Sequence, residues 1–404
     1  MEFYKRRNVP CFKSVFMNKN KPQTFFLAKI HSLTYHPSDL IKKIKLRAYD
    51  FRSFNVNKSA SIGQVIFNPT NRIAFSKWVT PKRTRSYPFA RIYDTYHHGG
   101  KVVTIIPVIK DEGAGASKNK SNNDRINFVT LSWMNLMNIY VILGWYSDAK
   151  KKSKYRITDQ RFEDRYIRDK LETISTFKLD AHHWNNKHFT EDFSLVLKKA
   201  SEAYEKIGEK HRVSMHPASR HIAFLDSIRS KKDSSKISLE KFADVTLGRS
   251  QQAAVRESSV THQLELLGES SKGVFQIENN LGGKYYLTAD EIFILPNRQV
   301  IIQESKNSSR GKLPSQSDVK DGLFKILLFS QISELYLGSK RVQFSVQLKL
   351  TGKLKGKLVL PCDSAILEKF IRLNGLGIAD QKTLRLLNEE SKSNHFRIVI
   401  QHND

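Results

Sequence analysis

Cysteine is nearly absent from this chain: Cys11 and Cys362 are the only two among its 404 residues. Two cysteines build neither a disulfide framework nor a zinc site of paired thiolates. Long apolar runs are also missing, because the longest, Leu136 to Tyr146, contains Asn138 and is too short to cross a bilayer. The first residues are charged, with no apolar segment of a signal peptide behind them. We therefore expect a cytoplasmic protein in a reducing compartment, with no membrane partner.

Acidic residues are scarce relative to basic ones. The 68 Lys and Arg residues outnumber the 39 Asp and Glu residues, which leaves a formal charge of +29. An excess of this size favours a polyanionic partner, most simply nucleic acid. A ribosome-associated protein or a protein on an anionic membrane surface would fit the same charge. The sequence has neither a GxxxxGKS/T phosphate-binding loop nor a methyltransferase glycine motif, so nothing indicates ATP or a methyl donor.

The densest basic stretch runs from Ala149 to Arg156 and reads AKKKSKYR. Charge runs are most often solvated faces, but a run this dense can also contact phosphate. Its basic residues are therefore candidate DNA contacts: Lys150, Lys151, Lys152, Lys154 and Arg156.

The most informative stretch runs from Lys284 to Lys306 and reads KYYLTADEIFILPNRQVIIQESK. Two apolar runs joined by a Pro-Asn turn predict two adjacent strands. Residues two apart in a strand share a face, so Glu304 and Lys306 project together, and the turn brings Asp290 and Glu291 close to them. Holding carboxylates and an ammonium together on one face of a sheet costs free energy unless they bind a ligand. Magnesium is the ligand that we expect, because it takes oxygen ligands and is held by one or two carboxylates plus substrate phosphate.

Predicted elements flank this hairpin in a regular order. Strict alternation of apolar and polar residues predicts the last strand most clearly. The predicted elements are a helix over about 248–267, a strand over 274–278, the two motif strands over about 284–295 and 299–306, a helix from Ser317 to about Gly338, and a strand over 341–350. The order is therefore helix, strand, strand, strand, helix, strand.

Asp290 followed by Glu304-Ser305-Lys306, in this order of elements, resembles the PD-(D/E)xK motif of metal-dependent nucleases, the superfamily that includes most type II restriction endonucleases. The resemblance covers about residues 248–350. It implies a restriction-endonuclease-like core in which Asp290 and Glu304 bind Mg²⁺ and Lys306 orients the attacking water. It also implies that Glu265, on the first helix, is an additional catalytic acid.

The chain departs from the family pattern at the first acid. The family often has Pro-Asp followed directly by apolar residues, whereas this chain reads Ala289-Asp290-Glu291-Ile292. Glu291 is therefore an alternative metal ligand, although we favour Asp290, with Glu291 pointing outward. Glu265 has a structural alternative too, as an exposed helix glutamate. The structural alternative for the whole stretch is a surface hairpin whose Glu304–Lys306 ion pair is worth at most about 1 kcal/mol.

We predict a mixed α/β (α+β) chain in four parts. These are a β-rich amino-terminal domain for DNA target recognition over 1–160, a helical linker region over 161–245, the PD-(D/E)xK core over 246–355 and a carboxy-terminal extension over 356–404. The long segment ahead of the core is most simply a domain that recognises the DNA target. In such a domain, contacts to bases specify the DNA sequence and basic residues position the protein on the phosphate backbone.

The function expected from these features is a magnesium-dependent, sequence-specific endonuclease acting on double-stranded DNA, as in type II restriction enzymes. A palindromic site would be read by a homodimer. A cognate DNA methyltransferase encoded nearby is the expected companion. The alternatives are a modification-dependent or repair endonuclease, and a non-catalytic nucleic-acid-binding protein.

A second acidic cluster is a weaker candidate site. A predicted hairpin that begins at Ala90–Tyr93 would bring Asp94 toward Asp111 and Glu112. Val108, however, occupies the position at which the PD-(D/E)xK motif has its second carboxylate. We therefore expect this hairpin to belong to the core of the amino-terminal domain.

Overall fold

The computed structural model of the chain describes residues 24–31, 33, 45–83, 86–96, 98, 100–115, 123–246, 271–279, 281 and 283–403. Over these residues the protein is mixed α/β, with several sheets. The helix predicted over about 248–267, and Glu265 with it, lies outside the described residues. None of the helices in the described part is long and apolar enough to cross a bilayer.

The amino-terminal half is built on a five-stranded sheet in the order β2-β3-β4-β5-β8. The strands are Ala48–Asp50 (β2), Ile62–Asn68 (β3), Asn71–Lys77 (β4), Lys101–Pro107 (β5) and Tyr140–Gly144 (β8). β3 and β4 are antiparallel, and the other neighbours are parallel. Every residue of β8 is buried, as expected for a strand that helices cover.

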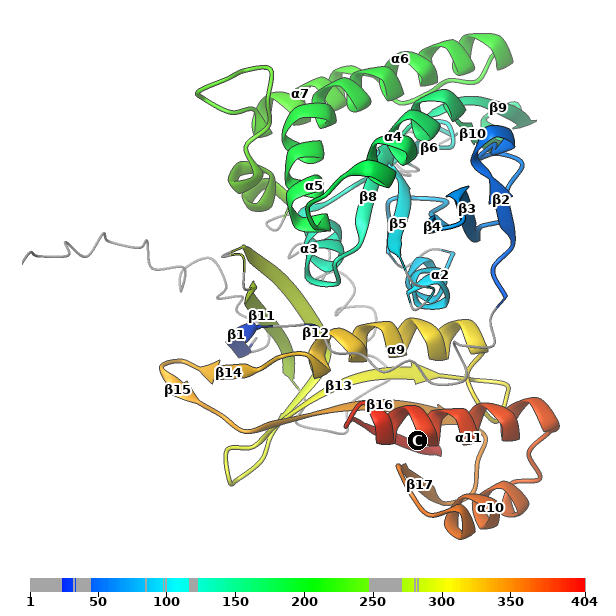
Figure 1. The fold of residues 1–404 in the computed structure, drawn as a ribbon, viewed down its shortest axis with the longest axis vertical. Helices are drawn as coiled ribbons and strands as arrows, with labels where there is room; N and C mark the ends of the chain where they lie inside the picture. The colour runs from blue at the N-terminus through cyan, green and yellow to red at the C-terminus, as the bar shows by residue number, and fades with distance from the viewer. Residues whose placement is uncertain are drawn as a thin grey trace, which may run out of the picture.

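Helices surround this sheet, as Figure 1 shows. Four of them contact β8, and a fifth, α7, packs on α6. Their bounds are Phe128–Leu136 (α3), Asp164–Thr176 (α4), Ala181–Lys187 (α5), Phe193–His211 (α6) and Ser219–Ile228 (α7). A π-helical turn over His188–Asp192 joins α5 to α6, and a short pair of strands, Ile109–Asp111 (β6) and Asn123–Arg125 (β7), lies beside α6.

The basic run forms the end of a two-stranded ribbon. β9 (Tyr146–Ser153) and β10 (Arg156–Phe162) are antiparallel. At the base of the ribbon Tyr146 and Phe162 are buried, with their ring centroids 4.5 Å apart. Every residue from 150 to 156 is exposed. The apolar base anchors the ribbon, and its charged end faces solvent.

The motif strands lie in the middle of a nine-stranded sheet in the order β15-β14-β1-β11-β12-β13-β16-β18-β17. Their bounds are Thr24–Ile30 (β1), Ser271–Asn279 (β11), Lys284–Ile294 (β12), Val300–Asn307 (β13), Glu334–Leu337 (β14), Lys340–Arg341 (β15), Phe344–Gly352 (β16), Lys357–Leu360 (β17) and Arg397–His402 (β18). β11, β12 and β13 form an antiparallel meander, and β16 runs parallel to β13. β1 joins this sheet by pairing in parallel with β11, so segments far apart in the sequence share it.

Helix α9 (Gln316–Ser330) lies between the nine-stranded sheet and the amino-terminal half (Figure 1). On one side it contacts β13 and β16, and on the other it contacts α2 (Pro88–Thr95). Phe324 of α9 packs against Phe89 of α2, with ring centroids 4.9 Å apart. Helices α10 (Ser364–Leu373) and α11 (Ile378–Ser393) precede β18. A single apolar core therefore connects both sheets, with α9 at its centre.

Two predicted elements are corrected by the structure. Ala90–Tyr93, predicted as a strand, lies in helix α2, because Phe89, Ile92 and Tyr93 recur at helical spacing and bury one face. The helix predicted to end near Gly338 ends at Ser330, because the following residues form β14 and pair with β1. The strands predicted over 274–278, 284–295 and 299–306 are confirmed as β11, β12 and β13, with ends shifted by a few residues.

Candidate active site

The pairing of β12 with β13 decides which side of the sheet each acid faces. Glu291 lies opposite Gln303, and Ile292 lies opposite Ile302. Because side chains alternate along a strand, the neighbouring positions Asp290 and Glu304 lie on the other face. The sheet therefore brings Asp290, Glu304 and Lys306 to the side that α9 covers, as the ion pairs below show.

Glu304 is a deeply buried carboxylate, with only 1% of its surface exposed. Its Oε1 atom lies 2.5 Å from the ammonium of Lys325 and 3.2 Å from that of Lys306. Its Oε2 atom is buried and accepts no hydrogen bond from a donor within the described part of the chain. The Glu304 carboxyl group is close enough to Asp290 for a hydrogen bond between the two carboxyl groups when one of them is protonated. A buried carboxylate oxygen without a partner is expensive. The two lysines therefore satisfy one oxygen of the Glu304 carboxylate and leave the other without a donor among the described residues.

Asp290 lies at the solvent side of the same site. Its side chain is 51% exposed, and its Oδ2 atom is 3.7 Å from Lys325 Nζ. The Lys325 ammonium thus contacts both Glu304 and Asp290. One cation between two carboxylates is the arrangement expected where like charges must share a counter-ion.

Lys306 extends from β13 to helix α9. Its Nζ atom donates a 2.7 Å hydrogen bond to Asp321 Oδ2 in addition to its contact with Glu304. Gly322 gives the lysine room, because a Cβ atom at that position would lie 3.3 Å from Lys306 Cγ and 2.8 Å from a methyl carbon of Leu348. The small residue at the helix surface therefore lets the ammonium lie between the two carboxylates.

Burial and charge shift the acidity of both strand residues. Burial raises the pKa of Glu304 to about 7 and the nearby Asp290 carboxylate adds to the rise, whereas Lys325 and Lys306 oppose it. Burial disfavours the charge on Lys306, but Glu304 and Asp321 outweigh that effect and raise the pKa of the ammonium. Lys306 is therefore charged at neutral pH, and Glu304 is poised to gain or lose a proton there.

The donor set fits a hard divalent cation. Glu304 Oε2 accepts no hydrogen bond from a donor among the described residues, and the Asp290 carboxylate lies beside it on the next strand. No group of three or more His, Cys, Asp or Glu residues with metal-binding geometry occurs in the described part of the chain. Two carboxylates suffice for magnesium, which keeps water and substrate phosphate in its remaining positions. A zinc site would need more nitrogen or sulfur ligands.

Glu291, the alternative ligand, has structural partners on the opposite face of the sheet. Its carboxylate accepts hydrogen bonds from Gln303 Nε2 at 2.6 Å and Ser305 Oγ at 2.8 Å. Gln303 in turn accepts a hydrogen bond from Gln347 of β16. Glu291 is thus separated from Glu304 by the sheet itself, and it orders the neighbouring strands.

The other acids considered from the sequence have partners of their own. Asp94 forms a 2.6 Å ion pair with Lys320 at the contact between α2 and α9. Asp111 is buried and lies 2.9 Å from His216 Nδ1, and Glu112 pairs with Lys110. These acids are not brought together with Asp290 and Glu304. The ribbon lysines lie at the exposed end of β9 and β10, apart from this cluster.

Two side chains of the site, Asp321 and Lys325, were not predicted from the sequence. Both lie on α9, four residues apart and therefore on one face of the helix. That spacing, in a helix otherwise rich in apolar residues, is the signal that could have identified them. Lys320, also on α9, pairs with Asp94 of α2 and is not part of the site.

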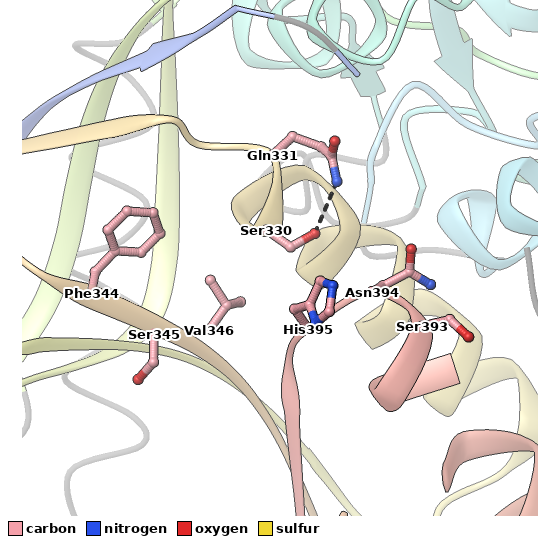
Figure 2. A pocket seen from close by; sticks show the side chains of 8 residues that line it. All are labelled: Ser330, Gln331, Phe344, Ser345, Val346, Ser393, Asn394 and His395. Atoms are coloured by element: carbon pink, nitrogen blue, oxygen red, sulfur yellow. Dashed lines mark hydrogen bonds between the residues drawn. The ribbon is translucent and has the colours of Figure 1, made fainter. Parts of the chain in front are cut away.

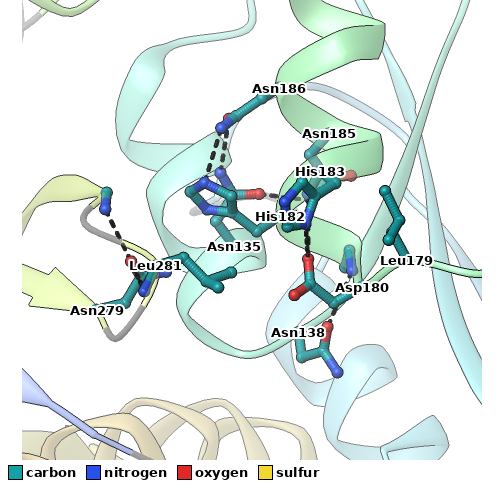
Figure 3. A network of polar contacts seen from close by, with 12 residues as sticks. Asn135, Asn138, Leu179, Asp180, His182, His183, Asn185, Asn186, Asn279 and Leu281 are labelled. Carbon is teal, nitrogen blue, oxygen red and sulfur yellow. Dashed lines mark hydrogen bonds and ion pairs between the residues drawn. The ribbon is translucent and has the colours of Figure 1, made fainter.

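A group of polar side chains that includes His182 connects the helices of the amino-terminal half to strand β12. His182 of α5 lies 2.6 Å from the hydroxyl of Tyr285 on β12. Its other ring nitrogen lies 2.9 Å from the Asn186 amide (Figure 3). Asn135 of α3 donates to the same hydroxyl. Burial lowers the pKa of His182, which favours the neutral ring. These contacts connect α3 and α5 to the motif strand.

A pocket of about 530 Å³ lies at the far end of α9 (Figure 2). Its walls are Ser330–Gln331 at the end of α9, 344–346 at the start of β16 and 393–395 at the end of α11. His395 is the one titratable side chain in this lining. The pocket therefore lacks the carboxylates and lysines of the Asp290–Glu304 site.

Comparison of the chain with protein-family models, curated proteins and solved structures finds no match.

Proposed function

We propose that this protein is a magnesium-dependent, sequence-specific endonuclease of the PD-(D/E)xK superfamily, a cytoplasmic type II restriction enzyme that cuts double-stranded DNA. The observation that carries the proposal is the buried Glu304 carboxylate beside Asp290, with Lys306 on the same face. The order of β11, β12, β13, α9 and β16, with β16 parallel to β13, supports a restriction-endonuclease-like core.

In the proposed reaction, Asp290 and Glu304 hold the magnesium ion, which supplies Lewis-acid chemistry at the scissile phosphate. The ammonium of Lys306 orients the attacking water and offsets the negative charge that grows on the phosphate oxygens. Asp321 keeps that ammonium charged and in place through its 2.7 Å hydrogen bond. Deep burial of Glu304 excludes bulk water from the inner side of the site.

The ribbon of β9 and β10 supplies phosphate contacts in this proposal. Lys150 is paired with Asp159, whereas Lys151, Lys152, Lys154 and Arg156 have no carboxylate partner within the described residues. Tyr155, 43% exposed, lies among them and can stack on a base or sugar. A two-stranded ribbon fits the major groove of B-form DNA. The net charge of +29 favours the same polyanion.

A palindromic target would be bound by a homodimer, because a two-fold symmetric site matches a two-fold symmetric protein. A cognate DNA methyltransferase encoded nearby would complete a restriction–modification system. The homodimer is tested by the mass of the protein in solution with and without a DNA duplex.

The decisive experiment incubates the purified protein with unmethylated phage DNA, with and without magnesium, at modest salt. Discrete magnesium-dependent fragments are the expected result, and their ends give the recognition site. A smear would indicate a repair or degradative nuclease instead. DNA that is retarded in a gel but uncut would favour a binding protein, or an enzyme that needs modified bases.

The Glu304→Ala variant tests the site assignment within the same experiment. Cleavage should be abolished, and binding should be retained or tightened, because the variant removes a negative charge that faces phosphate. Cleavage at the wild-type rate would contradict the assignment of the active site.

A further inference from the structure

The ammonium of Lys325 lies between the carboxylates of Asp290 and Glu304, where it balances their negative charge. It lies 2.5 Å from Glu304 and 3.7 Å from Asp290, the two residues proposed to hold magnesium. A positive charge at this distance from both acids competes with any metal ion that binds them. Lys325 is therefore an internal counter-ion of the metal-free site.

The second lysine of the site is held differently. Lys306 keeps a partner, Asp321, that is separate from the Asp290–Glu304 pair, at 2.7 Å. The acids that pair with Lys325 are Asp290 and Glu304 themselves. A metal ion on those two acids thus leaves Lys306 paired and displaces Lys325. Because the lysine stem has four rotatable bonds, the ammonium can move without a shift of α9.

The charges of the site indicate where Lys325 goes. When Asp290, Glu304 and Asp321 are all ionised, their three carboxylates face the two ammonium groups of Lys306 and Lys325, which leaves one negative charge. A magnesium ion turns this into one positive charge. A single phosphodiester, which carries one negative charge, then neutralises the site with both lysines still present.

We propose that Lys325 is a displaceable cation: it fills the metal position between Asp290 and Glu304 in the resting protein, and passes to the DNA phosphate when the divalent ion binds. Only the second step of this inference, the transfer of the ammonium to the DNA phosphate, rests on the proposed function. Its first step, competition with the metal, concerns the protein without DNA. Metal entry and DNA binding are coupled in this arrangement, because the ammonium that the metal displaces becomes a phosphate contact.

Metal binding without DNA tests the first step. Manganese, as a paramagnetic substitute for magnesium, is titrated into the wild-type protein and into Lys325→Met, with the bound ion followed by electron paramagnetic resonance. Lys325→Met should bind manganese about tenfold more tightly, because the competing charge-assisted contact is gone. Lys325→Arg, which keeps the charge, should return the affinity toward the wild-type value. Equal or weaker binding by Lys325→Met would overturn the proposal.

A matched control is available on the same helix. Lys320 is as buried as Lys325, with 16% and 18% of the side chain exposed, but it pairs with Asp94. Lys320→Met should leave manganese affinity unchanged. Thermal melting of all variants establishes that each is folded, and an equal tightening in both methionine variants would also overturn the proposal.

DNA cleavage tests the second step. At saturating magnesium, Lys325→Met should cut more slowly than wild type and bind DNA with a weaker salt dependence, because one fewer ammonium neutralises the phosphate backbone. Unchanged cleavage and salt dependence would overturn the transfer to phosphate. If the wild-type protein cuts no DNA but Lys325→Met still binds manganese more tightly, the nuclease proposal is refuted and the competition between Lys325 and the metal is supported.

Discussion

Asp321 accepts a 2.7 Å hydrogen bond from Lys306, and this contact joins helix α9 to the end of strand β13. The two residues lie in different elements and are separated by the loop that precedes the helix. Their contact depends on α9 crossing over the sheet, where it packs on β13 and β16. The orientation of the central lysine is therefore set by a helix that the strand motif does not include.

Removing the Asp321 carboxylate should impair cleavage more than stability. In Asp321→Asn, Lys306 keeps Glu304 as its anionic partner but loses the ion pair that holds it away from the metal position. We expect the cleavage rate at saturating magnesium to fall about tenfold or more, as when a preorganised group is disturbed. Asp318→Asn, on the same helix and hydrogen-bonded to Ser315, is the control. Equal reductions in both variants would argue against a specific role for Asp321.

The metal-free protein should lose stability as the pH rises toward neutrality. Glu304 has a folded-state pKa of about 7 against an ordinary value of 4.5, so the native protein holds this proton more tightly than the unfolded chain. The favourable contribution is complete below pH 4.5 and is lost as pH rises through about 7, by about 3 kcal/mol in total.

Thermal midpoints in chelator at pH 5 and pH 8 measure this effect. The fall from pH 5 to pH 8 should be larger in the wild type than in Glu304→Gln, which cannot ionise. Added magnesium should reduce the difference at pH 8, because it binds the ionised carboxylate. Parallel pH profiles of wild type and variant would show that Glu304 titrates normally.

The Gly322→Ala substitution should disturb the position of the Lys306 side chain. The new Cβ atom would lie 3.3 Å from Lys306 Cγ and 2.8 Å from a Leu348 methyl carbon, so the lysine or the helix must move. Overpacking of this kind costs about 1–3 kcal/mol of stability. We expect a loss of cleavage in addition, because the ammonium is displaced. Gly377→Ala, where a Cβ meets nothing within 4 Å, is the control for both readouts.

The ribbon should contribute to DNA affinity without affecting the metal. Replacing Lys151, Lys152 and Lys154 by alanine should weaken binding to all duplexes and reduce the salt slope by about 0.9 for each phosphate that is no longer neutralised. Manganese affinity should not change. The control replaces another exposed set: Lys231, Lys232 and Lys236. A similar drop in affinity in the control would mean that net charge, and not the ribbon, determines binding.

The hairpin of the candidate site could be predicted because strand periodicity is local. Side chains alternate in any extended strand, so the spacing of Glu304 and Lys306 implies a common face before any partner is known. The Pro-Asn turn between the apolar runs similarly implies antiparallel pairing with the strand of Asp290. The structure has this pairing and separates Asp290 from Glu291 by the sheet.

Elements that depend on distant partners could not be predicted in this way. Ala90–Tyr93 has residues that suit a strand, yet it is helical because α9 offers an apolar surface for one helical face. Glu334–Leu337 continues the apolar pattern of the preceding helix, yet it forms β14 because β1 supplies a strand to pair with. Tertiary contacts override local propensity in both places.

The amino-acid sequence alone determined the excess of positive charge, the scarcity of cysteine and the alternation that places Glu304 and Lys306 on one face of a strand, whereas the pairing of β12 with β13 decided that Asp290 and not Glu291 shares that face. The charge and the cysteine count follow from composition, and the shared face of Glu304 and Lys306 follows from the geometry of a single strand. The tertiary structure alone decided that Asp321 and Lys325 complete the site and that Glu304 is buried. Burial and ion pairing are properties of packed surfaces, and α9 reaches this face only when both halves of the protein pack against it.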